Sequence, residues 1–284
     1  MDKMKENDEH HLNAKNFQLL AILYPDELHF LQSVARSIHI PADTAVIEEG
    51  QDNQQLYLVK SGILHVSKKH HDFTFEIGSI TPGEVFGEAS ILFHEPAGAN
   101  VHTVEACELY AIDISYLQEI IQDNSRFNHA IHQLAERRSV AGTLAINPVF
   151  SNLPQAVREV MLYNGEYTTS EKGDVLFYEG DTTTEFLYLI LSGHAQVSMQ
   201  HPSNHDKKVV FANLTPGDEV GELAIITHKP RAATVTATST LRLFKISLQS
   251  IHPWMLRYSD FEHALRHGVE KKLQHNLEAL RQKD

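Results

Sequence analysis

Two residues suited to hold a small phosphorylated ligand lie nine positions apart late in the chain, at Glu222 and Arg231. Gly221 precedes the glutamate and would let the backbone approach a ligand closely. Free N–H groups at the start of a short helical turn suit an anion. Glu222 can accept hydrogen bonds from a sugar hydroxyl, and Arg231 offers a planar fork of donors to phosphate oxygens. The spacing predicts a site for a ligand with one phosphate and one sugar hydroxyl.

The stretches Val220–Ile226 and Pro230–Val235 resemble the phosphate-binding cassette of cyclic-nucleotide-binding domains. They read Gly-Glu-Leu-Ala and then Pro-Arg-Ala-Ala-Thr-Val at the family spacing. The family includes the regulatory subunits of cyclic-AMP-dependent protein kinase and the bacterial catabolite activator. The resemblance implies that Glu222 accepts from the ribose 2′-hydroxyl and that Arg231 holds the charge of the phosphate. The alternative is a surface turn whose glutamate and arginine are merely solvated.

The same resemblance implies further contacts around this pair. Backbone N–H groups of the short helix and of the residue after the arginine complete the phosphate cradle. A strand before the turn contacts the base, and Val220 stands where many relatives have phenylalanine. The implied ligand-binding residues are Gly221, Glu222, Leu223, Ala224, Arg231, Ala232, Ala233, Phe211 and Ala212.

Family members often cap the base with an aromatic side chain from the C-terminal helices. Trp254 and Tyr258 are the candidates here. For Trp254, packing in the core between a helix and the roll is an equally good interpretation. Ala232 follows the arginine where a hydroxyl in kinase relatives favours the guanine nucleotide. The resemblance therefore favours cyclic AMP over cyclic GMP.

The composition sets outer limits on the function. The chain has 284 residues, 42% hydrophobic residues and a net charge of −13, which argues against a broad nucleic-acid surface. No apolar run approaches the roughly 20 residues of a membrane span, and the polar start Met1–His11 does not read as a secretory signal. The single cysteine, Cys107, excludes an intramolecular disulfide. These features predict a cytoplasmic protein.

The chain repeats itself. Gly87-Glu88 and Gly221-Glu222 stand 134 positions apart, and Leu56-Tyr-Leu58 and Leu187-Tyr-Leu189 stand 131 apart. Short strands bounded by Gly, Pro, Asn and Asp predict an antiparallel β-roll of the jelly-roll type in each copy. The expected class is mixed α+β, mainly β, with helices flanking each roll. The expected division is a polar segment at 1–20, a degenerate cyclic-nucleotide-type domain at 21–146 and an intact one at 147–284.

The two cassettes are unequal. The first keeps Gly87 and Glu88, but Ala97 stands where the second has Arg231. A cyclic phosphate would lose its bidentate cation there, which typically costs a few kcal/mol or about a hundredfold in affinity. His94 or His102 would be a weak replacement near neutral pH. The first pocket is therefore predicted to be degenerate.

Amphipathic helices are expected to flank the rolls. The first roll should follow a helix near Leu19–Ser37, and one helix is expected over Leu117–Ala145, ending before Asn147-Pro148. The last segment carries an apolar stripe at helical spacing, for which packing on its own roll is slightly favoured over a dimer contact. The stripe is Phe261, Leu265, Val269, Leu273, Leu277 and Leu280.

Three functions remain open on the sequence. The first is a receptor without enzymatic activity, cofactor or metal, which binds a cyclic nucleotide and acts through an unidentified effector protein. The second is a ligand-free scaffold of two rolls. The third is a bicupin-type metalloenzyme, which needs histidines near Thr215–Glu222 or Thr81–Glu88, where the sequence has none. The segment Glu136–Val140 reads as a charged helical turn rather than a kinase-inhibitory motif.

Overall fold

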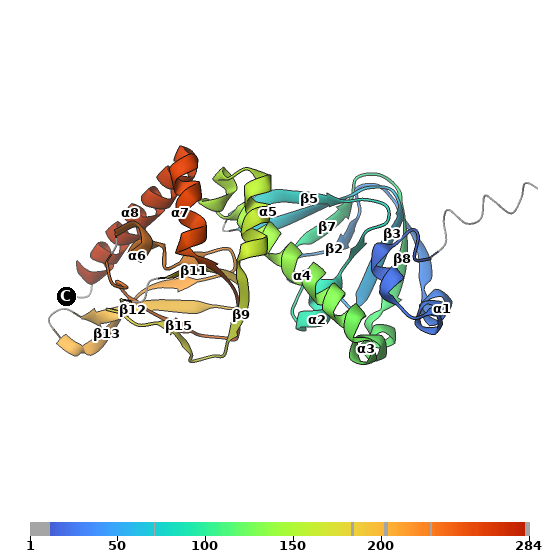
Figure 1. Ribbon diagram of the computed structural model, residues 1–284, viewed down its shortest axis with the longest axis horizontal. Coiled ribbons are helices and arrows are strands. Elements are labelled where there is room, and N and C mark those ends of the chain that lie inside the picture. The colour runs from blue at the N-terminus through green and yellow to red at the C-terminus, as the bar shows by residue number, and fades with distance from the viewer. Residues whose placement is uncertain (1–11, 71, 183–184, 202–203, 228, 282–284) are drawn as a thin grey trace, which may run out of the picture. The chain divides into compact units, whose positions relative to one another are not determined.

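The computed structural model describes residues 12–281 except 71, 183–184, 202–203 and 228 (Figure 1). The chain divides into two compact units, one ending at Gly142 and the other beginning at Thr143. This division falls inside helix α4 (Ser125–Ile146), four residues before the predicted start of the second domain at 147.

The first unit is an antiparallel β-roll built from two four-stranded sheets. Their strand orders are β1-β8-β3-β6 and β2-β7-β4-β5. Its elements are η1 (Gln18–Ile22), α1 (Pro25–Val34), β1 (Arg36–Ile40), β2 (Ala45–Ile47), β3 (Gln55–Ser61), β4 (Leu64–His70), β5 (Phe73–Ile80), β6 (Val85–Phe86), α2 (Glu88–Phe93), β7 (Asn100–Thr103), β8 (Cys107–Asp113), α3 (Ile114–Asp123) and the start of α4.

The second unit repeats this plan. Its sheets have the orders β14-β11-β16-β9 and β10-β15-β12-β13, again antiparallel. Its elements after α4 are η2 (Phe150–Asn152), α5 (Gln155–Asn164), β9 (Glu166–Ser170), β10 (Val175–Phe177), β11 (Phe186–Ser192), β12 (Ala195–His201), β13 (Asn204–Leu214), β14 (Glu219–Val220), α6 (Glu222–Thr227), β15 (Thr234–Ala237), β16 (Leu241–Ser247), α7 (Leu248–Arg257) and α8 (Ser259–Arg281). The predicted class of two tandem β-rolls flanked by helices is confirmed.

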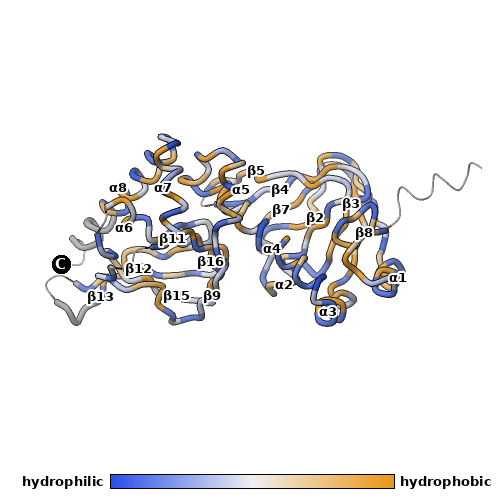
Figure 2. The backbone as a smooth tube through the Cα atoms, in the orientation of Figure 1, coloured by the Kyte–Doolittle hydropathy of each residue, from blue (hydrophilic) through white to orange (hydrophobic). Residues whose placement is uncertain are grey.

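Alternating apolar residues on the strands form the cores of the rolls, as the orange and blue alternation along the strands in Figure 2 illustrates. In β8, Cys107, Leu109 and Ala111 are buried in one unit, and in β16 Leu241 and Leu243 are buried in the other. The first core also takes in three residues that precede the predicted domain start at residue 21. These are Leu12, Phe17 and Leu20.

The helices differ from the predictions at two places. Arg36 and Ser37 belong to β1 rather than to the first helix, which ends at Val34. The single helix predicted over Leu117–Ala145 is two helices, because Asn124 takes an extended conformation between α3 and α4 and its side chain accepts from the N–H of Phe127. The predicted end before Asn147 is confirmed.

Helix α8 packs on its own unit through the first half of its apolar stripe. Phe261, Leu265 and Val269 are buried, whereas Leu273 is 37% exposed. The helix contacts α6, α7 and β13, and Figure 1 shows it beside α6. The preference for intramolecular packing is confirmed for these residues, and the side chains of Leu277 and Leu280 lie outside the described ones. Every helix in the described ranges is too short or too polar to cross a lipid bilayer.

Candidate ligand site

The cassette of the second unit begins at a glycine that the backbone requires. Gly221 has a φ of +100°, and α6 starts at the next residue. A Cβ on this residue would lie 2.6 Å from Arg231 Nη1 and 3.1 Å from the carbonyl oxygen of Phe186. The predicted short helical turn after Gly221 is confirmed, and the glycine provides both the positive φ and the room for the arginine.

Arg231 is 4% exposed and held on three sides. Nη1 donates to the carbonyl oxygen of Gly221 at 2.9 Å, and Nη2 donates to that of Phe186 at 2.8 Å. The guanidinium lies over the ring of Phe177, 4.2 Å from its centroid, a cation–π contact. Burial lowers the pKa of Arg231, and the nearby charge of Glu222 opposes this. The side chain is therefore a fixed, charged donor.

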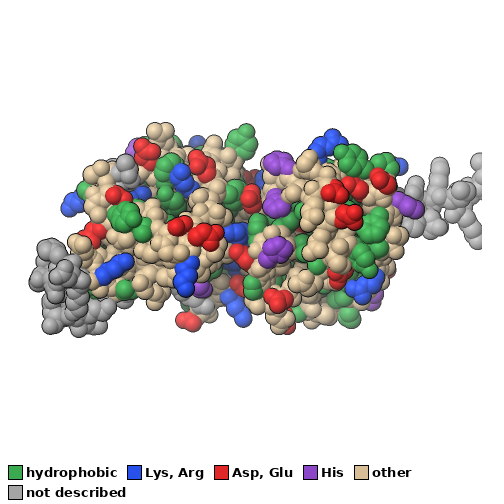
Figure 3. All heavy atoms as spheres, turned by 90° about the horizontal axis from the view of Figure 1, so that it is seen from below, with side chains coloured by type: hydrophobic (Ala, Val, Ile, Leu, Met, Phe, Trp, Pro, Cys, Tyr) green, Lys and Arg blue, Asp and Glu red, His purple; other side chains and the backbone are tan. Residues whose placement is uncertain are grey.

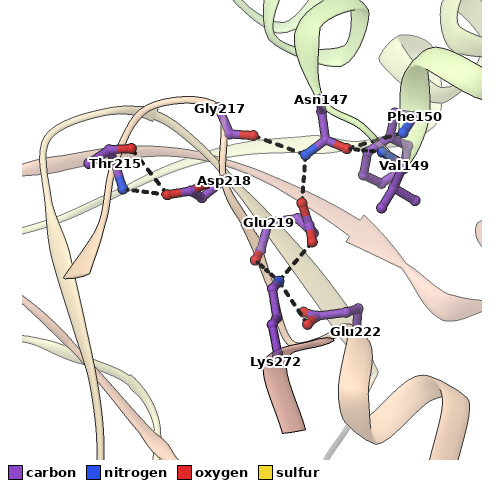
Figure 4. A network of polar contacts seen from close by, with 9 residues as sticks. All are labelled: Asn147, Val149, Phe150, Thr215, Gly217, Asp218, Glu219, Glu222 and Lys272. Carbon is purple, nitrogen blue, oxygen red and sulfur yellow. Dashed lines mark hydrogen bonds and ion pairs between the residues drawn. The ribbon is translucent and has the colours of Figure 1, made fainter. Parts of the chain in front are cut away.

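Glu222 is 3% exposed and meets a lysine from α8. Lys272 Nζ donates to Glu222 Oε1 at 2.8 Å, to Glu219 Oε1 at 2.7 Å and to the carbonyl oxygen of Glu219 at 2.9 Å (Figure 4). Burial alone would lower the pKa of Lys272, but the charges of Glu222 and Glu219 and the hydrogen bonds to them raise it above its ordinary value. The lysine is charged throughout the neutral range.

Glu219 is fixed from the other side by Asn147, the residue that follows α4. Asn147 is fully buried, and its Nδ2 donates to Glu219 Oε2 at 2.6 Å and to the carbonyl oxygen of Gly217 at 2.9 Å (Figure 4). Its Oδ1 accepts from the backbone N–H groups of Val149 and Phe150. Asn147, Glu219, Lys272 and Glu222 form one continuous polar network.

Two buried atoms at this site have no hydrogen-bond partner. Among the described residues, the buried side-chain atoms without one are Glu222 Oε2, Arg231 Nε and Thr236 Oγ1. Leaving such groups unpaired costs about 1–3 kcal/mol each, more when they are charged. Two of the three belong to the residues predicted to hold a ribose hydroxyl and a phosphate.

The remaining predicted residues surround the cassette unevenly. Ala224, Ala233 and Phe211 are buried, Leu223 and Ala212 are half-buried, and Ala232 is exposed. Trp254 lies in α7 and Tyr258 is its C-cap, with their ring centroids 6.2 Å apart. The structure places this aromatic pair together, and its role as a base lid stays a prediction.

The first unit builds a similar turn without the arginine. Gly87 has a φ of +89°, and Glu88 is 3% exposed. Asn53 Nδ2 donates to the carbonyl oxygens of Gln55 at 2.8 Å and Gly87 at 3.1 Å. Gln55 and Gly87 correspond to Phe186 and Gly221, the residues whose carbonyls accept from Arg231. In the first unit the amide of Asn53 therefore makes the two backbone hydrogen bonds that the guanidinium makes in the second.

Apolar side chains surround position 97 of the first unit. Ala97 is 6% exposed and belongs to a buried cluster with Ile47 and Phe86. Ile47 aligns with Phe177, so the aromatic platform of the arginine is missing together with the arginine itself. Phe86 stacks on Tyr57 with centroids 4.9 Å apart. These contacts suit an apolar core and offer no cation at position 97.

The sequence analysis did not assign the three side chains that contact a cassette glutamate or replace the arginine. Lys272 contacts Glu222, Arg138 contacts Glu88 at 3.4 Å, and Asn53 replaces the arginine. Arg138 lies in the segment interpreted as a charged helical turn, which is indeed helical within α4, and the structure adds the contact of this arginine with Glu88. A signal existed, because Arg138 and Lys272 stand 134 positions apart, the offset that relates the two cassettes.

The described residues were also searched for side chains that could bind a metal ion. In the parts of the chain that the structure describes, no group of three or more His, Cys, Asp or Glu residues could hold a metal ion. Histidine, acidic and basic side chains are interspersed on the face shown in Figure 3.

The chain is similar in sequence to known proteins over most of its length. It is 28% identical over 236 residues to a cAMP-dependent protein kinase regulatory subunit of Mycosarcoma maydis, covering 78% of this chain and 42% of that protein. It is 26% identical over 270 residues to patatin-like phospholipase domain-containing protein 6 of Mus musculus, covering 94% of this chain and 18% of that protein. The chain thus spans less than half the length of either relative.

Among solved structures, the regulatory domain of Toxoplasma gondii PKA with cAMP aligns over 95% of this chain and 98% of its own, at 23% identity and a TM-score of 0.43. The family described as the cyclic nucleotide-binding domain matches at residues 37–124 and again at 168–258. These two matches cover more than half of the sequence and one cassette each. The chain belongs to the cyclic nucleotide-binding domain family.

Proposed function

We propose that this chain is a receptor for a cyclic nucleotide, bound in the second unit, and that it regulates a protein partner without catalysing a reaction itself. The observation that carries this proposal is the pair of unpartnered buried atoms, Glu222 Oε2 and Arg231 Nε. A ribose 2′-hydroxyl would satisfy the first and a cyclic phosphate the second. No metal or cofactor is needed for this function.

Cyclic AMP is the proposed ligand. Ala232 follows the arginine and is exposed. Because the side chain of alanine has no hydroxyl, it offers no hydrogen bond to a guanine base. The relative in Mycosarcoma maydis is a cAMP-dependent protein kinase regulatory subunit, which supports the same ligand. Cyclic GMP is expected to bind more weakly.

The response to the ligand is proposed to be a population shift of the C-terminal helices. Helix α8 reaches the cassette through Lys272, so a ligand at Glu222 acts on a residue already connected to that helix. A ligand shifts such an equilibrium only by its difference in affinity for the two states. The effector would bind a surface made by α7 and α8.

The test is calorimetric titration of the purified protein with cyclic AMP and cyclic GMP, repeated on Arg231→Ala. We expect one site per chain, lost in the variant, with cyclic AMP the tighter ligand. Arg266→Ala is the matched control, because it removes one arginine from the same unit, with 51% of its side chain exposed and an ion pair to Glu262. It should bind like the unsubstituted protein.

Arg231→Ala also removes the donor from the backbone carbonyls of Gly221 and Phe186, so the fold of this variant must be checked by circular dichroism and thermal unfolding. Arg231→Lys keeps the charge but not the fork and should bind with intermediate affinity. Two sites per chain would contradict the assignment of the first pocket. Binding of neither nucleotide would favour the alternative, a scaffold of two rolls that binds only protein.

A further inference from the structure

A cavity of about 670 Å³ lies in the first unit between three segments of the chain. They are the stretch 15–22, which contains η1, the turn 82–85 that leads into β6, and one face of α4. All of its lining residues belong to the first unit. The volume falls within the range of about 300–1,000 Å³ that is usual for small-molecule sites. The cavity is therefore large enough for a small ligand.

Most of the wall of this cavity is aliphatic. Ala130, Leu134 and Arg138 follow one another at four-residue steps on α4, so they share one side of the helix. None of the described lining residues is aromatic, so the wall offers no ring on which a nucleobase could stack. It suits an alkyl chain instead. The aliphatic lining residues are Leu19, Ile22, Pro82, Val85, Ala130 and Leu134.

The charged groups of the lining leave one cation for a ligand. Arg138 is shared by two carboxylates, because its guanidinium lies 3.4 Å from Glu84 Oε1 and 3.4 Å from Glu88 Oε1. The second oxygen of Glu84 accepts from the backbone N–H of Thr81 at 2.8 Å and from its hydroxyl at 2.9 Å. Lys15 is exposed, and its ammonium makes no hydrogen bond or ion pair within the described part of the chain. An anion in the cavity would therefore meet Lys15.

The second unit has an aliphatic side chain where Lys15 stands. Asn13 and Asn147 each accept, through Oδ1, from the backbone N–H of the residue two positions later. That residue is Lys15 in the first unit and Val149 in the second. Val149 is only 3% exposed and packs against α8, with its Cγ2 3.9 Å from the place of a Cβ on Gly268. The exchange of a buried valine for an exposed lysine adds a cation to this side of the first unit alone.

We infer that this cavity binds a small aliphatic carboxylate, with its alkyl chain against the aliphatic wall and its carboxylate on the ammonium of Lys15. The alkyl chain supplies the hydrophobic part of the affinity, and the charge-assisted hydrogen bond supplies the orientation. This site is separate from the nucleotide site proposed in the second unit, and its test does not depend on that function.

The probes are octanoate and octanol, which share an alkyl chain and differ in charge, titrated calorimetrically into the full-length protein. Octanoate should bind at one site per chain and more tightly than octanol. Lys15→Gln should weaken octanoate binding about fivefold, a modest loss because water screens an exposed ammonium. Octanol should bind the unsubstituted protein and Lys15→Gln with similar affinity.

Two further variants separate the charge from the cavity. Ala130→Leu extends a lining side chain into the cavity and should weaken both probes. Lys69→Gln removes an exposed lysine of β4 that does not line the cavity, and it should leave both affinities unchanged. Thermal unfolding of each variant shows that the first unit remains folded, and Lys15→Gln, at an exposed position, is the variant least able to disturb it.

Four outcomes would overturn the inference. Octanoate that does not saturate the unsubstituted protein would show that the cavity takes no such ligand. Equal affinity for octanol would show that Lys15 does not select an anion. Octanoate affinity that is unchanged in both Lys15→Gln and Ala130→Leu would place the binding elsewhere. Tighter binding of a hexaglutamate peptide than of octanoate would assign the cavity to an acidic peptide segment.

Discussion

Asn53 and Arg231 donate to equivalent pairs of backbone carbonyls, one pair in each copy of the repeat. The amide reaches its two acceptors at 2.8 and 3.1 Å and the guanidinium at 2.8 and 2.9 Å. The arginine thus has a structural duty besides its proposed contact with phosphate. In the first unit the neutral side chain of Asn53, from another loop, makes these hydrogen bonds, and Ala97 stands at the position of the arginine.

This relationship predicts that Ala97→Arg alone will not restore a ligand site. The new guanidinium would enter an apolar cluster and find its two carbonyls already occupied by Asn53. An unpaired buried charge is expensive, so the variant should lower the unfolding temperature of the first unit. Adding Asn53→Ala frees both carbonyls and should recover part of the loss, with a coupling of about 1–3 kcal/mol in a double-mutant cycle.

Differential scanning calorimetry of the two single variants and the double variant measures that coupling. Strictly additive effects would show that Asn53 and an arginine at position 97 do not share acceptors. Nucleotide titration of the double variant then asks whether the missing aromatic platform at Ile47 also has to be rebuilt.

Gly221→Ala should impair both stability and binding. At a φ of +100° an alanine is strained by about 1–2 kcal/mol, and its Cβ would collide with Arg231 Nη1. Gly173→Ala is the matched control, because Gly173 has a φ of +98° and nothing within 4 Å of the added Cβ. Both variants should lose similar stability from the backbone, and only Gly221→Ala should lose cyclic AMP affinity in a titration. Equal affinities in the two variants would contradict the predicted role of the arginine.

The only tryptophan of the sequence makes α7 visible to fluorescence. If Trp254 covers the base, cyclic AMP should change its emission, and Arg231→Ala should abolish that change. Trp254→Leu should then weaken binding several-fold, since stacking on a base is worth about 1–3 kcal/mol. Tyr258→Phe keeps the neighbouring ring and serves as its control. An unchanged affinity in Trp254→Leu would assign Trp254 to packing alone.

Asp113 should stabilise the first unit in a pH-dependent way. It is the N-cap of α3 and accepts from the backbone N–H and hydroxyl of Ser115, and these hydrogen bonds hold the pKa of Asp113 below its ordinary value of 3.8. A carboxyl with a lowered folded pKa stabilises the fold above its unfolded pKa and loses that effect as the pH falls through the folded value.

The substitution Asp113→Ala should therefore cost about 1 kcal/mol at pH 7 and progressively less below about pH 4. Ser247 is the equivalent N-cap of α7 and cannot ionise, so Ser247→Ala should cost a similar amount at both pH values. Urea unfolding at pH 7 and pH 3 provides the comparison. A cost of Asp113→Ala that does not fall at low pH would exclude the ionised cap.

The sequence predicted the elements that depend on local patterns. The strands of the second roll, the glycine before α6 and the end of α4 before Asn147 follow from turn residues, from alternation and from the restriction that proline places on its predecessor. The break at Asn124 was missed because its cause is a side chain that caps the next helix, which an apolar period does not reveal.

The contacts that complete the site were harder to predict. Lys272 lies 50 residues after Glu222, and only the docking of α8 brings them together. Asn53 lies 34 residues before Gly87 in a loop of unremarkable composition. Such pairs are set by tertiary packing. The internal repeat was the one signal that could have aligned Arg138 with Lys272 and pointed to both.

The contact between Arg138 and Glu88 affects how the cassette glutamate in a sequence should be interpreted. In both copies a cation from the last helix contacts the glutamate after the cassette glycine, whereas only the second copy adds a buried arginine that lies over an aromatic ring. Contact with the helix and the proposed contact with a sugar are therefore separable roles of this glutamate. A glutamate at this position indicates by itself no more than a docked helix, and the arginine nine residues later together with Phe177 is what distinguishes the second copy from the first.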